Sequence, residues 1–215
     1  MSGTIIVISG PSAVGKSRVI KELLKYNGNL EFITSYTTRK PRENEEEGRD
    51  YYFVSEEEFL HLIEAGKLLE WKKTGYGYYG TPKDSVRDSL HKNNTVILDV
   101  DSQGFAAVKK QNFASVNGIY LLPESLAVLR EQILARGAKR GINTTQDAEV
   151  RFQDALNSIR TAHRYDLVMI NEKVPETAKM IVKWMDVLKF RDSREALLKE
   201  WYKANDIFTG WERDE

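Results

Sequence analysis

The stretch that decides the fold is Gly10-Pro11-Ser12-Ala13-Val14-Gly15-Lys16-Ser17, which matches the pattern G-x-x-x-x-G-K-S at every fixed position. A run of mostly β-branched residues, Thr4–Ser9, precedes it and is typical of a strand buried on both faces. An amphipathic pattern over residues 17–26 follows it and predicts a helix. In this setting a glycine-rich turn can surround an oxyanion with backbone N–H groups, aided by the positive N-terminus of the helix. The sequence therefore predicts a phosphate-binding loop.

Two side chains of this loop have specific expected partners. Lys16 is expected to reach the β- and γ-phosphates of a nucleoside triphosphate, and the Ser17 hydroxyl is expected to bind Mg²⁺. The loop alone leaves the second substrate open, because GTPases, ATPases and small-molecule kinases all use it.

The alternation of strand and helix continues along the chain. Three further apolar runs are expected to be buried strands: Thr95–Val100, Gly118–Leu121 and Leu167–Ile170. Helical patterns lie between and after them, at residues 83–91, 125–136, 148–163 and 176–190. This alternation predicts an α/β fold with a parallel central sheet and helices on both faces.

Composition narrows the class of protein. A length of 215 residues suits one domain, and the 32 basic and 32 acidic residues give no basic excess of the kind that nucleic-acid binders carry. The absence of cysteine excludes disulfide frameworks and thiolate metal sites. We find no secretory signal and no run of 18 apolar residues, so we expect a cytoplasmic protein that binds neither nucleic acid nor membrane, as a monomer or homodimer.

The stretch from Ser35 to Thr81 breaks the alternation, because it is rich in Tyr, Thr, Arg and Gly. We expect it to form an inserted lobe of short strands and one helix. A capping box formed by Ser55 and Glu58 marks the start of that helix, and Gly66 follows its end.

Cationic and phenolic side chains of this lobe are candidates for a phosphate clamp built from charge-assisted hydrogen bonds: Arg39, Arg42, Tyr51 and Tyr79. The acidic run Glu43–Glu47 between them is expected to be a solvated surface. The lobe also offers groups for a base. The Glu70 carboxylate can accept hydrogen bonds from N1–H and the exocyclic amine of guanine, while the hydroxyl of Ser35 or Thr81 can donate to O6.

Together these motifs resemble the guanylate kinase family. They occur in matching order over about residues 3–190: GPSAVGKS at 10–17, SYTTRKPR at 35–42, E-x-x-G-x-D-Y-Y-F at 45–53, LLEW at 68–71, YYGT at 78–81, LDVDSQG at 98–104 and HRYD at 163–166. The resemblance implies the three-layer P-loop NTPase fold with a GMP-binding lobe and a lid. It also implies phosphoryl transfer from ATP to GMP with Mg²⁺ as cofactor, and deoxy-GMP as a further acceptor.

The resemblance implies a role for each matching residue. Guanine would be read by Ser35, Glu70, Thr81 and Asp101, and the GMP phosphate would be held by Arg39, Arg42, Tyr51 and Tyr79. ATP would be bound by residues 10–17 and by Asn171, which lies where the family approaches the adenine. Ser17 and Asp99 would lie at the metal, although Asp99 can also be explained as a carboxylate that caps a helix or orders a loop. Charge neutralisation during transfer would come from Lys16, Arg39, Arg42, Arg136 and Arg151.

The chain departs from the family pattern in three places. Ala13 stands where many relatives have glycine, and Leu134 replaces one arginine of the lid motif R-x-R-G. The segment 138–146 is longer than usual, so Lys139 or Arg140 can compensate for the missing charge. We expect a guanylate kinase-like domain over 1–190, with the lobe at 35–81 and the lid at 134–151. A helical extension over 191–215 would pack Trp201 and Tyr202 against the core.

Two other functions remain open at the level of sequence. The first is a catalytically silent scaffold of guanylate kinase type that binds a protein or peptide, against which the intact loop argues. The second is a kinase for another nucleoside monophosphate or a phosphorylated sugar, against which Ser35, Glu70 and Thr81 argue.

Overall fold

A five-stranded parallel sheet forms the centre of the molecule. The structure is a computed structural model that describes residues 3–26, 29–112, 114–138 and 145–188. The strand order is β2-β7-β1-β8-β9, and the strands are β1 (Thr4–Ser9), β2 (Leu30–Phe32), β7 (Thr95–Leu98), β8 (Ser115–Leu122) and β9 (Leu167–Ile170). All four pairings are parallel, which places the carboxyl ends of the strands along one edge. Ligands of open α/β sheets bind at that edge.

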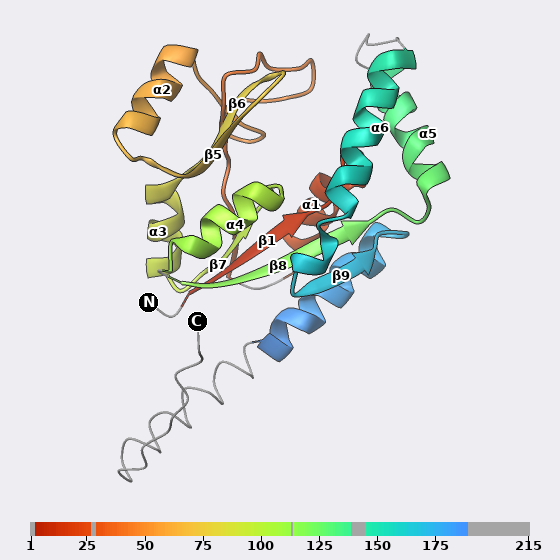
Figure 1. Cartoon of the computed structure of the whole chain (residues 1–215). Helices are drawn as coiled ribbons and strands as arrows, with labels where there is room; N and C mark the ends of the chain where they lie inside the picture. Colours follow the sequence, from red (N-terminus) through yellow and green to blue (C-terminus); the bar gives the residue numbers. More distant parts are fainter. Residues whose placement is uncertain (1–2, 27–28, 113, 139–144, 189–215) are drawn as a thin grey trace.

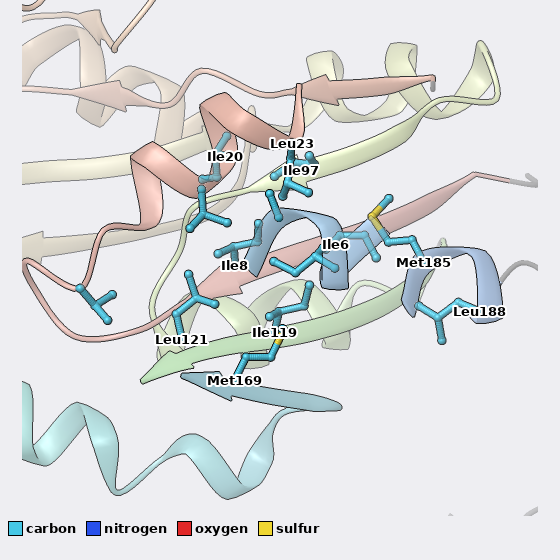
Figure 2. Close-up of a cluster of buried hydrophobic side chains, with 14 residues drawn as sticks. Ile6, Ile8, Ile20, Leu23, Ile97, Ile119, Leu121, Met169, Met185 and Leu188 are labelled. Atoms are coloured by element: carbon cyan, nitrogen blue, oxygen red, sulfur yellow. The ribbon is translucent and has the colours of Figure 1, made fainter. Parts of the chain in front are cut away.

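Helices cover both faces of this sheet. On one face, α1 (Lys16–Leu23) and the helix over residues 174–188 pack on the even-numbered residues Ile6 and Ile8 of β1, as Figure 2 shows. On the other face, α3 (Lys83–His91) and α4 (Ser102–Lys110) pack on the odd-numbered residues of β1. This period-two division is what a strand buried on both faces requires. The three-layer architecture therefore follows from the apolar runs.

The stretch that we expected to be an inserted lobe carries a second sheet. Its order is β4-β3-β6-β5, and its elements are β3 (Tyr36–Thr37), β4 (Tyr52–Phe53), α2 (Glu56–Glu64), β5 (Leu68–Thr74) and β6 (Gly77–Pro82). Helix α2 begins with both hydrogen bonds of the predicted capping box between Ser55 and Glu58. We call residues 35–82, which hold this second sheet, α2 and the loops between them, the acceptor lobe.

A helical pair follows β8. Helix α5 (Leu126–Ala138) packs against α6 (Thr145–Ile159) through Leu129, Ile133 and Ala155, and the short helix η1 (Ala162–Arg164) leads into β9. Figure 1 shows this pair and the acceptor lobe rising from the same side of the central sheet.

The structure confirms the predicted strands and helices of the core, with ends that differ by a few residues. Two elements were not predicted: β2, and α4, whose pattern is short and contains Gly104. The expectations for Lys139, Arg140, residues 191–215, Trp201 and Tyr202 lie outside the described residues. No helix of the described ranges is long and apolar enough to cross a membrane.

Candidate active site

The phosphate loop connects the end of β1 to the start of α1. It turns through three residues with positive φ: Gly10 at 151°, Ala13 at 72° and Gly15 at 98°. Glycine adopts such angles freely, whereas a residue with a Cβ in the left-handed region costs roughly 1–2 kcal/mol. Ala13 therefore carries strain that a glycine at this position would not have.

Lys16 lies over its own loop. Its Nζ donates to the carbonyl oxygen of Gly10 at 2.9 Å and to that of Pro11 at 3.4 Å, and it lies 3.9 Å from Oδ1 of Asp99. Asp99 comes directly after β7, at the carboxyl edge of the sheet. The phosphate loop, the Lys16 ammonium group and the Asp99 carboxylate thus lie together at the carboxyl edge of the sheet, where the triphosphate is expected.

The hydroxyl of Ser17 and the carboxylate of Asp99 are the oxygen ligands available for a metal ion here. Ser17 is exposed in the first turn of α1. The described residues contain no cluster of three or more His, Cys, Asp or Glu side chains that could hold a metal by themselves. Mg²⁺ usually takes one or two protein oxygens and completes its shell with water and substrate phosphates, so this sparse donor set fits it.

Asn171 follows β9 and braces the phosphate loop from the other side. Its Nδ2 donates to the carbonyl oxygen of Val14 at 2.7 Å, and its backbone N–H donates to Leu122 at 2.8 Å. A Cβ added to Gly15 would lie 2.8 Å from this Nδ2. Oδ1 of Asn171 is buried and has no hydrogen-bond partner within the described part of the chain. The residue is therefore in place beside the loop, with one acceptor atom to spare.

In the acceptor lobe, Arg39 and Arg42 are bridged by Glu45. Two nitrogens of the Arg39 guanidinium donate to this carboxylate at 2.8 and 3.0 Å. Arg42 donates to it through Nη1 at 3.3 Å and through its backbone N–H at 2.9 Å. The expectation that the whole acidic run is a solvated surface is wrong for Glu45, whose side chain is only 15% exposed. We call Arg39, Arg42 and Glu45 the arginine clamp.

Burial and pairing act against each other in this clamp. Burial alone would raise the pKa of Glu45, but the hydrogen bonds from Arg39 and Arg42 outweigh it and lower that pKa. Burial would likewise lower the pKa of Arg39, yet its bonds to Glu45 and Tyr79 raise it. Arg39 and Glu45 therefore both stay charged near neutral pH.

Two tyrosines complete the clamp. The hydroxyl of Tyr79 accepts a hydrogen bond from Nε of Arg39 at 3.2 Å, and the Tyr51 ring lies 5.3 Å below the same guanidinium. Burial, helped by the charge of Asp99, raises the pKa of Tyr51 to about 12.

A buried carboxylate lies at the far end of the lobe. Glu70 on β5 is 9% exposed, and its Oε1 accepts a hydrogen bond from the Thr81 hydroxyl at 2.6 Å. Burial raises the pKa of Glu70, and the nearby charge of Asp101 adds to the effect. Its Oε2 faces Gly104, where an added Cβ would lie 3.0 Å away. Glu70 and Thr81 thus place a hydrogen-bond acceptor and a hydroxyl next to a position, Gly104, where only glycine leaves room for the carboxylate.

Asp101 has two partners. Its Oδ1 accepts from the backbone N–H groups of Gln103 and Gly104 and so caps α4, while its Oδ2 pairs with Lys72 at 2.5 Å. Burial would raise its pKa, but Lys72 and the two N–H groups outweigh that and lower it. Ser35 lies just before β3, partly buried, and its carbonyl oxygen accepts from Tyr52.

The two arginines expected in the lid occupy different environments. Desolvation and the positive charge of Arg42 lower the pKa of Arg136 on α5. Tyr51 and Asp99 act in the opposite direction but are outweighed. Arg151 on α6 instead contacts Tyr76 of the acceptor lobe, to which it donates two hydrogen bonds.

The sequence did not predict three contacts of the site, which are made by Glu45, Lys72 and Tyr76. Lys72 could have been found, because it follows Glu70 by two residues and a strand places both on one face. Glu45 and Tyr76 gave no such pattern, because their partners come from tertiary contacts.

Comparison with known proteins identifies the family of this chain. The family model described as guanylate kinase matches residues 2–187. A guanylate kinase of Clostridium tetani is 41% identical over 192 residues, 89% of each chain, and one of Thermotoga maritima is 40% identical over 182 residues, 85% of this chain and 86% of its own. A crystal structure of guanylate kinase from Anaplasma phagocytophilum superposes with a TM-score of 0.74 and 29% identity over 97% of both chains. The chain belongs to the guanylate kinase family.

Proposed function

We propose that this protein transfers the γ-phosphoryl group of ATP to the 5′-phosphate of GMP, and also of deoxy-GMP, to give ADP and the diphosphate. The observation that carries the proposal is the phosphate loop with Lys16 3.9 Å from Asp99, combined in one chain with the arginine clamp of the acceptor lobe. Family membership supports the same reaction.

In the proposed reaction an oxygen of the GMP phosphate attacks the γ-phosphorus of ATP in line with the leaving group. The bond from the γ-phosphorus to the bridging oxygen breaks, and ADP leaves with that oxygen. The attacking oxygen is already ionised, so no strong general base is needed. Catalysis then rests on positioning and on charge neutralisation by cations around the transferred group.

We assign the cations by their surroundings. Lys16 would leave its own loop carbonyls for the β- and γ-phosphates, and Arg39 and Arg42 would hold the acceptor phosphate with Tyr51 and Tyr79. Arg136 and Arg151, the latter held at the Tyr76 hydroxyl, would add positive charge at the transferred group. Ser17 and Asp99 would hold Mg²⁺, which would supply positive charge to offset that of the donor phosphates.

The base would be read by groups at the other end of the lobe. Glu70 would accept from N1–H and the exocyclic amine of guanine, Thr81 and Ser35 would supply hydroxyls, and Asp101 would lie beside the amine. Asn171 is assigned to the nucleotide-binding side through its contact with Val14 and its spare Oδ1. The division into a domain at 1–190, a lobe at 35–81, a lid at 134–151 and an extension at 191–215 stays a prediction. So do the cytoplasmic location and the monomeric or homodimeric state.

The test is a coupled assay of ADP release with the purified full chain, ATP and a panel of acceptors: GMP, deoxy-GMP, AMP, UMP and IMP. We expect Mg²⁺-dependent release of ADP with GMP and deoxy-GMP. Release with AMP or UMP at the same rate would overturn guanine specificity. No release with any acceptor would favour the silent scaffold.

A further inference from the structure

Tyr76 links two parts of the molecule that are 75 residues apart in sequence. Its hydroxyl accepts hydrogen bonds from Nε of Arg151 at 3.2 Å and from Nη2 at 2.7 Å. The same guanidinium lies 5.4 Å from the centre of the Tyr76 ring. Tyr76 stands in the turn between β5 and β6, whereas Arg151 stands on α6. This contact therefore joins the acceptor lobe to the helical pair.

The turn that presents Tyr76 is internally ordered. The Thr74 hydroxyl donates to the carbonyl oxygen of Gly77 at 3.0 Å and accepts from the backbone N–H of Tyr76 at 3.1 Å. Gly77 adopts a φ of 132°, which glycine alone adopts readily. Tyr76 is 56% exposed, so burial does not fix its ring. The turn, rather than a core, sets where the phenol lies.

The same turn is anchored to the strand that leads to the arginine clamp. The Thr38 hydroxyl accepts from the backbone N–H of Tyr78 at 3.0 Å, and the backbone N–H of Thr38 donates to Tyr78 at 3.2 Å. A Cβ added to Gly77 would lie 2.7 Å from the Thr38 hydroxyl and 3.2 Å from the backbone nitrogen of Arg39. The hairpin tip and the backbone of Arg39 are therefore in direct contact.

We propose that Tyr76 is a positioning residue for Arg151. It holds the Arg151 guanidinium toward the acceptor lobe, where this group meets the transferred phosphoryl group. The proposal rests on the phosphotransfer function proposed above. An arginine side chain loses much rotational freedom when it is fixed, and a preformed contact removes part of that cost from the reaction step. Its effect on the reaction would therefore pass through Arg151, the side chain that it contacts.

The first measurement is steady-state kinetics of Tyr76→Phe, which keeps the ring and removes the hydroxyl. A net hydrogen bond of ordinary strength corresponds to about a 2- to 10-fold change, so we expect kcat to fall by that factor while KM for GMP stays nearly constant. Tyr52→Phe is the matched control, since Tyr52 is an exposed tyrosine of the same lobe whose ring makes a tilted contact with Tyr36. A kcat for Tyr76→Phe that equals or exceeds that of the wild type would overturn the proposal.

A double-mutant cycle gives the second measurement. If Tyr76 acts through Arg151, Tyr76→Phe has no further effect on kcat in an Arg151→Met background, because the two changes remove the same interaction. Effects that simply multiply would contradict the proposal and indicate a separate role for Tyr76.

The third measurement does not depend on activity. Hydrogen exchange of the amides of α6 should be faster in Tyr76→Phe than in the wild type, with the amides of β1 unchanged. Unaltered exchange in α6 would count against the contact itself. A wild-type protein that fails to phosphorylate GMP would instead refute the proposed function, while this measurement still reports on the contact.

Discussion

On the proposed function, the phosphate loop and the acceptor lobe bind the same kind of group, a phosphate, but they are built differently. The loop uses backbone: three positive φ angles and a helix start set its shape, and the Asn171 side chain braces it. The lobe uses side chains that belong to separate strands and loops, such as Arg39, Glu45 and Tyr79. A site made of backbone is sensitive to substitution mainly at the residues with special angles, whereas a site made of side chains depends on each partner in turn.

The largest expected effect tests whether the loop nevertheless relies on one side chain. Lys16→Ala should lower kcat by on the order of 10²–10³ or more, the scale for losing one donor to a developing charge. Lys21→Ala, an exposed lysine of the same helix, is the control. Coupled ADP release measures both, and an unimpaired Lys16→Ala enzyme would refute the assignment of the loop.

The next effect tests the clamp. Arg39→Met removes a cation that holds Glu45 and Tyr79, so kcat/KM for GMP should fall by about 10- to 150-fold, the range for a hydrogen bond to a charged group. KM for ATP should change little. Lys40→Ala, the exposed neighbour, controls for charge alone. Equal losses for GMP and ATP would mean that the clamp does not belong to the acceptor side.

A third test concerns base recognition and pH. Glu70→Gln should raise KM for GMP by roughly 5- to 150-fold, because donors of the guanine ring lose a charged acceptor in a buried site. The raised pKa of Glu70 means that it takes up a proton at a higher pH than an ordinary carboxyl group does. The wild-type KM for GMP should therefore rise as pH falls below neutral.

The Glu70→Gln variant is its own control for pH, because titration of the GMP phosphate affects both enzymes alike. The ratio of their KM values should shrink toward one as pH decreases. A constant ratio across the range, or an undiminished preference of the variant for GMP over IMP, would refute the role of Glu70.

The smallest effect tests the backbone character of the loop. Gly15→Ala places a Cβ at a φ of 98° and 2.8 Å from Asn171, so it should destabilise the protein by about 1–2 kcal/mol, or roughly 2–8 °C in Tm. Gly75→Ala is matched to it, since an added Cβ at Gly75 meets nothing within 4 Å. Similar Tm values for the two variants would show that the loop is not held by its angles.

The same contrast explains what could be predicted from the sequence. Apolar runs such as Thr4–Ser9 and the loop after them depend on local pattern, so the order of core elements and the place of Lys16 could be derived directly. Helix α4 was missed because its nine residues include Gly104, and its N-cap, Asp101, had been given another role. Local pattern also supplied the capping box of α2.

Side-chain partnerships across the lobe could not be derived in this way. Arg39 and Glu45 form a pair only because the loop between them folds back, and Tyr76 meets Arg151 only when α6 stands beside the hairpin. Lys72 shares a strand face with Glu70, yet its pairing with Asp101 depends on where β5 meets α4. The resemblance named the residues of the site but not these contacts.

Glu45 gives the arginine clamp a further property. Without it, two guanidinium groups would repel each other; with it, the lobe holds an internal counter-ion. If GMP binds here as proposed, its entry is an ion exchange in which a dianionic phosphate replaces a single carboxylate. Guanosine offers no such charge and would leave the carboxylate in place, so the clamp would select against the nucleoside independently of the base.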